Sequence, residues 1–156
     1  MLLAQSRHET ALGKEWMSVK ISHLHLSDFM LFQQADFQWS PGINVICGTN
    51  STGKTALIKL MYSLHKSYEQ WNSTETKEAA VNRFSEKLCG VFRPDNGKVG
   101  RLVRRKQGNA QMTASMGYEN GTSIDVNFGN RASKIATLIL PKMEHTASPD
   151  HTAVYF

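Results

Sequence analysis

The residues best suited to chemistry in this sequence form one unbroken stretch. It matches the pattern G-x-x-x-x-G-K-[S/T] and consists of Gly48, Thr49, Asn50, Ser51, Thr52, Gly53, Lys54 and Thr55. The two glycines can adopt backbone angles closed to other residues, so the loop can curl and direct its N–H groups toward an anion. Lys54 supplies a cation for β- and γ-phosphates, and the Thr55 hydroxyl is a ligand for the Mg²⁺ that bridges them.

This pattern is informative only between a buried strand and a helix. Residues 43–47 are mostly apolar and are bounded by Pro41-Gly42 and Gly48, which predicts a core strand. Apolar residues then recur at helical spacing, namely Leu57, Leu60, Met61, Leu64, Tyr68 and Trp71. Strand, phosphate loop and helix are therefore expected over 43–71, with ATP and Mg²⁺ as cofactors. The alternative is a glycine-rich turn without a ligand.

Composition excludes some other classes of protein. The chain has 156 residues, 40% of them hydrophobic, enough for one domain or most of one. No apolar run approaches the roughly 18–20 residues of a membrane span, so no membrane contact and a cytoplasmic location are expected. Cys47 and Cys89 lack metal-ligand spacing and are predicted to be buried, reduced thiols rather than a disulfide.

The net charge of +5 is unevenly distributed. Residues 93–106 contain one acid, Asp95, and a basic cluster, defined as Arg93, Lys98, Arg101, Arg104, Arg105 and Lys106. The cluster could contact nucleic acid phosphates, or it could be the solvated edge of a strand, which basic residues protect from aggregation. His23 and His25 lie on one side of a predicted strand without an evident third ligand, so no metal site is predicted there.

The remaining pattern predicts an α/β domain over 17–141. Residues 1–16 have no period and are predicted to be a disordered leader. Strands are expected over 19–26 and around Phe37, a second helix over 73–92 with Asn72 and Glu75 as a capping box, and a β meander over 99–140. The meander strands are 99–106, 110–118, 124–128 and 135–140, with a hairpin turn at Asn120-Gly121. Residues 142–156 are predicted to be a loop or a truncated end.

Residues 21–64 resemble the N-terminal end of the SMC/RecF/OLD-like class of ABC-type P-loop ATPases, often called AAA family ATPases. The resemblance rests on Leu24-x-Leu26-x-x-Phe29, Phe37 and the run Gly42-Ile43-Asn44-Val45-Ile46-x-Gly48-x-Asn50-x-x-Gly53-Lys54-Thr55. It implies an ABC-ATPase-head-like N-terminal lobe in which the loop residues contact the nucleotide. The similarity of the later meander to the antiparallel subdomain of such heads is an analogy of fold.

The sequence also differs from this family in its motifs. The family carries an acidic motif (Walker B), four apolar residues followed by Asp-Glu, and an LSGG-type signature, and the sequence contains neither. No catalytic residue is therefore identified. By the resemblance, Glu144 is a candidate for the position of the family's lid or glutamine-containing loop, and the alternative is an ordinary surface acid. Ser51 and Thr52 also depart from the commoner residues at their positions.

Two functions remain open from the sequence. The first is the ATP-binding, N-terminal portion of an ATPase that hydrolyses ATP when two heads close as a homodimer, in DNA maintenance or defence. The second is a stand-alone nucleotide-binding or interaction module without turnover. A GTPase or a small-molecule kinase shares only the loop, and the Asn-Lys-x-Asp string of guanine readers is absent.

Overall fold

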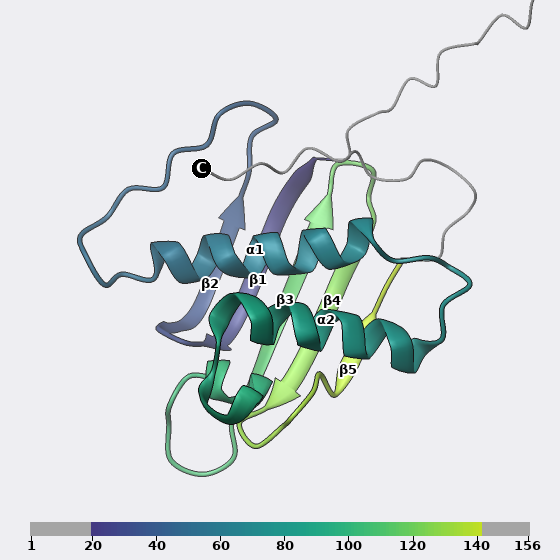
Figure 1. The fold of residues 1–156 in the computed structure, drawn as a ribbon. Coiled ribbons are helices and arrows are strands. Elements are labelled where there is room, and N and C mark those ends of the chain that lie inside the picture. The colour runs from purple at the N-terminus through teal and green to yellow at the C-terminus, as the bar shows by residue number, and fades with distance from the viewer. Residues whose placement is uncertain (1–19, 142–156) are drawn as a thin grey trace, which may run out of the picture.

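The computed structural model describes residues 20–141 and contains one antiparallel sheet with two helices on one face (Figure 1). The strand order is β2-β1-β3-β4-β5. The strands are β1 (Ile21–Phe29), β2 (Phe32–Gln38), β3 (Gln111–Tyr118), β4 (Ser123–Gly129) and β5 (Thr137–Ile139). The chain is thus an α/β fold with an antiparallel sheet, as the sequence predicts at the level of class.

The two faces of the sheet differ in character because side chains alternate along each strand. Leu24 and Leu26 of β1 are buried opposite Met116 and Ala114 of β3, which in turn lie opposite buried residues of β4. The other face is polar and carries, among others, His23, His25, Ser115, Asp125 and Asn127. The ring of His23 lies directly over Gly117, where an added Cβ would come within 1.9 Å of it.

Helices α1 (Lys54–Glu69) and α2 (Lys77–Phe92) lie side by side over the apolar face (Figure 1). Their buried stripes include Leu57, Leu60 and Leu64 from α1 and Ala80, Phe84 and Leu88 from α2. Burial of one such leucine or phenylalanine stabilises the fold by about 1.5–3 kcal/mol. This packing fixes α1 on the sheet, and the phosphate loop precedes its first residue. Among the described residues no helix is long and apolar enough to cross a membrane.

The predicted core strand over 43–47 does not form. The segment has no strand assignment, Ile43 is 93% exposed and Val45 is 78% exposed. Apolar residues favour a strand only where a neighbouring strand pairs with it, and within residues 20–141 none does. The Asn44 side chain instead bonds the backbone N–H and carbonyl of Ser40 and closes a turn. Cys47 is consequently exposed rather than buried, whereas Cys89 is partly buried, and both thiols are free.

The predicted strand over 99–106 is also wrong. The chain forms two short 3-10 helices, η1 (Asp95–Gly97) and η2 (Val99–Leu102), and then one isolated bridge from Val103 to Phe29. Val99, Leu102 and Val103 are buried, and their spacing is that of a helical turn rather than a strand. The basic residues over 101–106 therefore do not alternate between the two faces of a strand.

Helix α2 begins later than predicted. Its N-cap is Thr76, whose hydroxyl accepts a hydrogen bond from the Ala79 N–H at 3.2 Å. Asn72 accepts from the Thr74 N–H instead, and Glu75 pairs with Arg83, so the predicted capping box is absent. The hairpin at Asn120-Gly121 is confirmed, with Gly121 at φ 81°. The predicted leader over 1–16, the end over 142–156 and Glu144 lie outside the described residues.

A buried polar cluster anchors the C-terminal end of α1 to β3. His65 Nδ1 lies 3.0 Å from the Tyr118 hydroxyl, and His65 Nε2 lies 3.3 Å from a Glu69 oxygen. The other Glu69 oxygen accepts from Lys66 at 2.7 Å. Burial lowers the pKa of His65 below its ordinary value of 6.5; the attraction of Glu69 opposes this effect and Lys66 adds to it.

We expect stability to fall with acid through this histidine. Because the pKa of His65 is lower in the folded than in the unfolded protein, the unfolded state binds more protons near pH 6. The contribution of His65 to the free energy of unfolding is therefore fully present above pH 6.5 and is lost as the pH falls below it. Urea midpoints at about pH 7.5 and about pH 5.5 test this. His65→Gln should reduce the difference between them, and an equal difference in both proteins would contradict the assignment.

Candidate nucleotide site

The phosphate loop lies between the exposed segment over 43–47 and the first residue of α1. Gly53 is the N-cap of α1 and has a left-handed backbone, φ 90° and ψ 4°. A Cβ at this position would lie 2.8 Å from the Phe32 ring, so both its backbone angle and its surroundings require glycine. The first N–H groups of α1 therefore open onto the loop, where the helix dipole favours an anion.

The Lys54 ammonium lies inside the curve of the loop. Its Nζ donates to the carbonyl oxygens of Gly48 and Thr49 at 2.7 and 2.5 Å. The Thr52 hydroxyl donates to the same Thr49 oxygen at 3.0 Å, a second hydrogen bond across the loop. Gly48 also borders this hydroxyl, because a Cβ there would lie 3.0 Å from Thr52 Oγ1. The loop thus holds a cation in a ring of backbone groups, an arrangement suited to a phosphate chain.

A cavity of about 410 Å³ opens beside the loop. It is lined by residues 50–56 of the loop and the start of α1, by Lys59 of α1, and by Met30, Leu31 and Phe92. The lining therefore combines polar and cationic groups with apolar side chains, which suits a phosphate chain joined to an organic group. Thr55 lines it and is exposed, so its hydroxyl is accessible to Mg²⁺. No residue that lines this cavity carries a carboxylate.

The structure gathers most of the predicted site. Asn50, Ser51, Thr52, Gly53, Lys54 and Thr55 line the cavity, while Gly48 and Thr49 contact the Lys54 ammonium. The sequence pattern does not identify Met30, Leu31, Phe32 or Phe92 as part of this site. Met30 and Leu31 lie in the turn between β1 and β2, Phe32 begins β2 and Phe92 ends α2, so no local pattern relates them to the loop.

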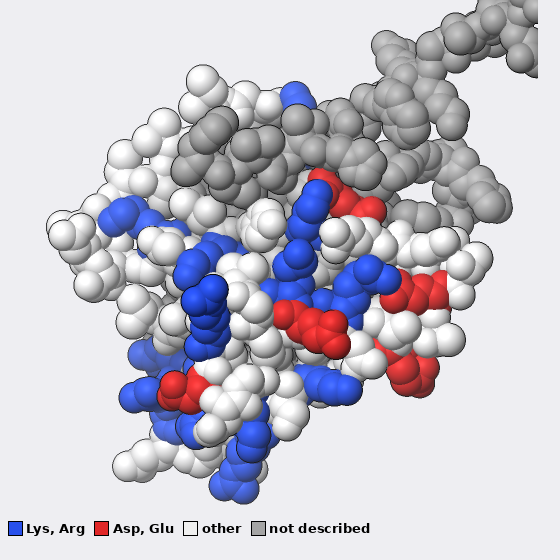
Figure 2. Space-filling view, viewed as in Figure 1, with Lys and Arg blue, Asp and Glu red and all other residues white. Residues whose placement is uncertain are grey.

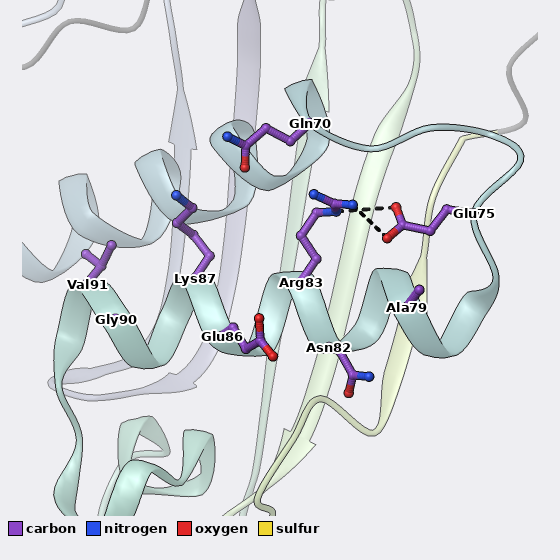
Figure 3. Close-up of a pocket in the computed structure, with 9 residues that line it drawn as sticks. All are labelled: Gln70, Glu75, Ala79, Asn82, Arg83, Glu86, Lys87, Gly90 and Val91. Atoms are coloured by element: carbon purple, nitrogen blue, oxygen red, sulfur yellow. Dashed lines mark hydrogen bonds and ion pairs between the residues drawn. The ribbon is translucent and has the colours of Figure 1, made fainter.

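A larger groove of about 620 Å³ runs between α1 and α2 (Figure 3). Two of its charged side chains, Arg83 and Glu75, pair with each other. Arg83 donates two hydrogen bonds to the Glu75 carboxylate, at 2.8 and 3.3 Å, and the Lys87 ammonium lies 5.9 Å from the centre of the Tyr62 ring. We place the candidate site at the phosphate loop, where Lys54 lines the smaller cavity at the N-terminus of α1, despite the larger size of this groove.

The residues of the basic cluster lie beyond the end of α2. Figure 2 shows blue side chains concentrated in the lower left, where Figure 1 places the short helices and the following loop. Arg93, Lys98, Arg101 and Arg105 are exposed, and Arg104 is half-buried. Lys106 is ion-paired with Asp28. Elsewhere in residues 20–141, His25 pairs with Asp36 at 2.5 Å, and no group of three His, Cys, Asp or Glu residues could hold a metal ion.

A protein-family model described as "AAA domain" matches residues 23–135, which include the loop, both helices, most of β1, and β2 to β4. The chain belongs to this AAA domain family. The match extends well beyond the loop pattern and covers most of the described residues. It confirms the predicted resemblance to the N-terminal part of an SMC/RecF-like P-loop ATPase.

Curated relatives of this AAA domain chain agree with that assignment. It is 33% identical over 72 residues to a "DNA replication and repair protein RecF" of Corynebacterium jeikeium, 46% of this chain and 16% of that protein. A protein of the same name from Streptococcus equi subsp. zooepidemicus is 27% identical over 56% of this chain and 27% of its own length. One from Limosilactobacillus reuteri is 34% identical over 45% and 21%. The chain thus spans about a quarter or less of these relatives.

Proposed function

We propose that this chain binds Mg²⁺–ATP or Mg²⁺–ADP at residues 48–55. The observation that carries the proposal is the Lys54 ammonium held inside the curved loop at the N-terminus of α1. Backbone N–H groups of the loop would surround the β-phosphate, Lys54 would neutralise the β- and γ-phosphates, and the Thr55 hydroxyl would be one ligand of Mg²⁺. Met30 and Leu31 supply apolar lining of the cavity beside the loop.

We further propose that the chain is the ATP-binding, N-terminal portion of an ABC-type ATPase head. The chain matches about a quarter or less of its relatives' length, and the cavity lining offers no carboxylate to hold Mg²⁺ or orient water. Those groups would come from further parts of the head or from a second head in a closed homodimer. The exposed apolar segment over 43–47 supports this proposal, because a strand supplied by the rest of the head would bury Ile43 and Val45.

Calorimetric titration of the 156-residue chain with Mg²⁺–ADP tests the binding proposal. Saturable binding near one nucleotide per chain supports it, and the absence of binding by folded protein refutes it. The alternative, a stand-alone binding or interaction module without turnover, shares this result. An Asp-Glu motif in the reading frame downstream of Phe156 would favour the ATPase head over that module.

A second proposal is that the basic cluster contacts DNA. The alternative explanation for these charges was a protected strand edge. That strand does not form: the cluster lies at the end of α2, on two 3-10 helices and on the loop that follows them. The names of the relatives, DNA replication and repair proteins, give a context in which such contact would serve a function. Exposed arginines and lysines bind phosphates without reading base sequence.

We expect DNA binding that weakens steeply with salt. Each neutralised phosphate contributes about 0.9 to the slope of log affinity against log salt. Because Lys106 is ion-paired with Asp28, replacing Arg101, Arg104, Arg105 and Lys106 with glutamine should flatten the slope by up to about three units, about 0.9 for each arginine. Fluorescence anisotropy with a short duplex measures the slope. An unchanged slope in the variant, with its circular dichroism spectrum intact, would reduce the cluster to a solvated surface.

A further inference from the structure

We propose that the turn between β1 and β2 links the phosphate loop to the basic cluster, so that nucleotide binding restrains the segment over 102–106. This linking turn consists of Asp28, Phe29, Met30, Leu31 and Phe32. It contacts the loop on one side and the segment on the other. The inference rests on the proposed nucleotide binding and adds a way in which that site regulates a distant surface.

The contact with the phosphate loop is made by Phe32. An added Cβ on Gly53 would lie 2.8 Å from Phe32 Cζ and 2.9 Å from Cε2, so the ring lies directly against the last glycine of the loop. Phe32 is itself supported by Phe37, edge-on at 6.1 Å between ring centres, and Phe37 stacks on Trp39 at 5.8 Å. Phe32 is thus a positioning residue, because it acts on phosphate through the backbone of Gly53.

The linking turn has a specific backbone shape. Asp28 and Met30 have φ of 48° and 46°, a left-handed region that costs energy for residues other than glycine. Phe29, between them, is fully buried and lies edge-on to Phe92 at 5.8 Å. Phe92 also lines the nucleotide cavity, together with Met30 and Leu31. A conformation of this kind persists only where its surroundings hold it, so movement at the cavity and movement of the turn are coupled.

The other side of the linking turn contacts residues 102–106. The Met30 N–H donates to the Leu102 carbonyl at 2.9 Å, and the Arg104 N–H donates to the Asp28 carbonyl at 2.7 Å. The Asp28 carboxylate is ion-paired with Lys106. These contacts complete a continuous path from Gly53 through Phe32 and the turn to residues 102–106. A nucleotide that fixes the loop would therefore stabilise the turn and its bonds to this segment.

Hydrogen exchange of the full chain, read by mass spectrometry or NMR, tests the proposal through two amides, those of Met30 and Arg104. A ligand at ten times its dissociation constant slows any opening that abolishes its site by about tenfold. With Mg²⁺–ADP at that concentration, both amides should exchange about tenfold more slowly. The Gly121 amide, which bonds Tyr118 in the distant β3–β4 turn, is the reference and should not change.

Two pairs of variants separate the link from general stability. Lys106→Gln removes the ion pair with Asp28 and should shrink the nucleotide effect at Arg104 by more than half while nucleotide affinity stays within about twofold, because Lys106 lies outside the nucleotide cavity. Lys98→Gln is the matched control, an exposed lysine of the same cluster, and should keep the full effect. Phe32→Leu should lose both affinity and effect, whereas Phe37→Leu, one ring further from the loop, should lose less.

The outcomes discriminate between the two proposals. Slowing at Met30 and Arg104 that Lys106→Gln reduces and Lys98→Gln preserves supports the link. Nucleotide binding without slowing at these amides overturns the link and leaves the proposed function intact, as does an equal effect in Lys106→Gln and Lys98→Gln. If the folded wild-type chain binds no Mg²⁺–ADP by calorimetry, both proposals fall.

Discussion

Lys54→Ala is expected to weaken Mg²⁺–ADP binding by about 1.5–3 kcal/mol, the range for hydrogen bonds to a charged group. Since about 1.4 kcal/mol is a tenfold change, the dissociation constant should rise by about 10- to 150-fold. The reason is local: Nζ is the cation that lies inside the loop curve, 2.7 Å from one backbone oxygen and 2.5 Å from the next. Calorimetry of both proteins under the same conditions measures the change.

The control for Lys54→Ala must remove a charge without touching the loop. Lys77→Ala fits, since Lys77 is the exposed first residue of α2 and does not line the nucleotide cavity. Its affinity should stay within about twofold of wild type, because surface charges at this distance are screened by salt. Equal affinity in wild type and Lys54→Ala, with both proteins folded, would exclude the loop as the nucleotide site.

The second large effect concerns hydrolysis. We expect the 156-residue chain alone to release phosphate from ATP at below about 10⁻³ per second, because groups that stabilise the transition state are worth about 10³- to 10⁵-fold in phosphoryl transfer. Residues 50–56 and their neighbours in the cavity include Lys54 and Lys59 but no acid to orient water. Phosphate release with saturating Mg²⁺–ATP measures the rate.

Contaminating ATPases are the main source of error in that assay, and Lys54→Ala controls for them. Activity that is equal in wild type and variant belongs to a contaminant. Robust turnover that Lys54→Ala abolishes would contradict the prediction and would mean that an acid outside the described cavity completes the site.

The elements that were predicted correctly are those whose signals are local. The loop pattern, the apolar stripe of α1 and the hairpin at Asn120-Gly121 each lie within a short stretch, and the structure forms all three elements. Residues 50–55 of the loop line one cavity, and the Lys54 ammonium contacts the carbonyl oxygens of Gly48 and Thr49. That this site binds a nucleotide is our proposal.

The failures have a common physical origin, because the deciding interaction lies elsewhere in the chain. Residues 43–47 have strand-like composition but no neighbouring strand within the described residues, so Val45 remains exposed. The apolar residues over 99–106 suit either a strand or a helical turn. The structure forms a 3-10 turn there, in which Gly100 packs closely on the backbone of Asn130. The Phe32–Gly53 contact joins two segments that no sequence period relates.

The segment ahead of the phosphate loop has a practical consequence for work with the purified chain. Ile43 has the largest exposed fraction of the large apolar side chains in the described residues, with Val45 nearby. Exposed apolar side chains of this kind favour contact with similar segments of other molecules. We therefore expect these few positions, rather than the well-packed core, to limit the concentration at which the purified chain stays monodisperse, and a detergent or a covering partner to raise that limit.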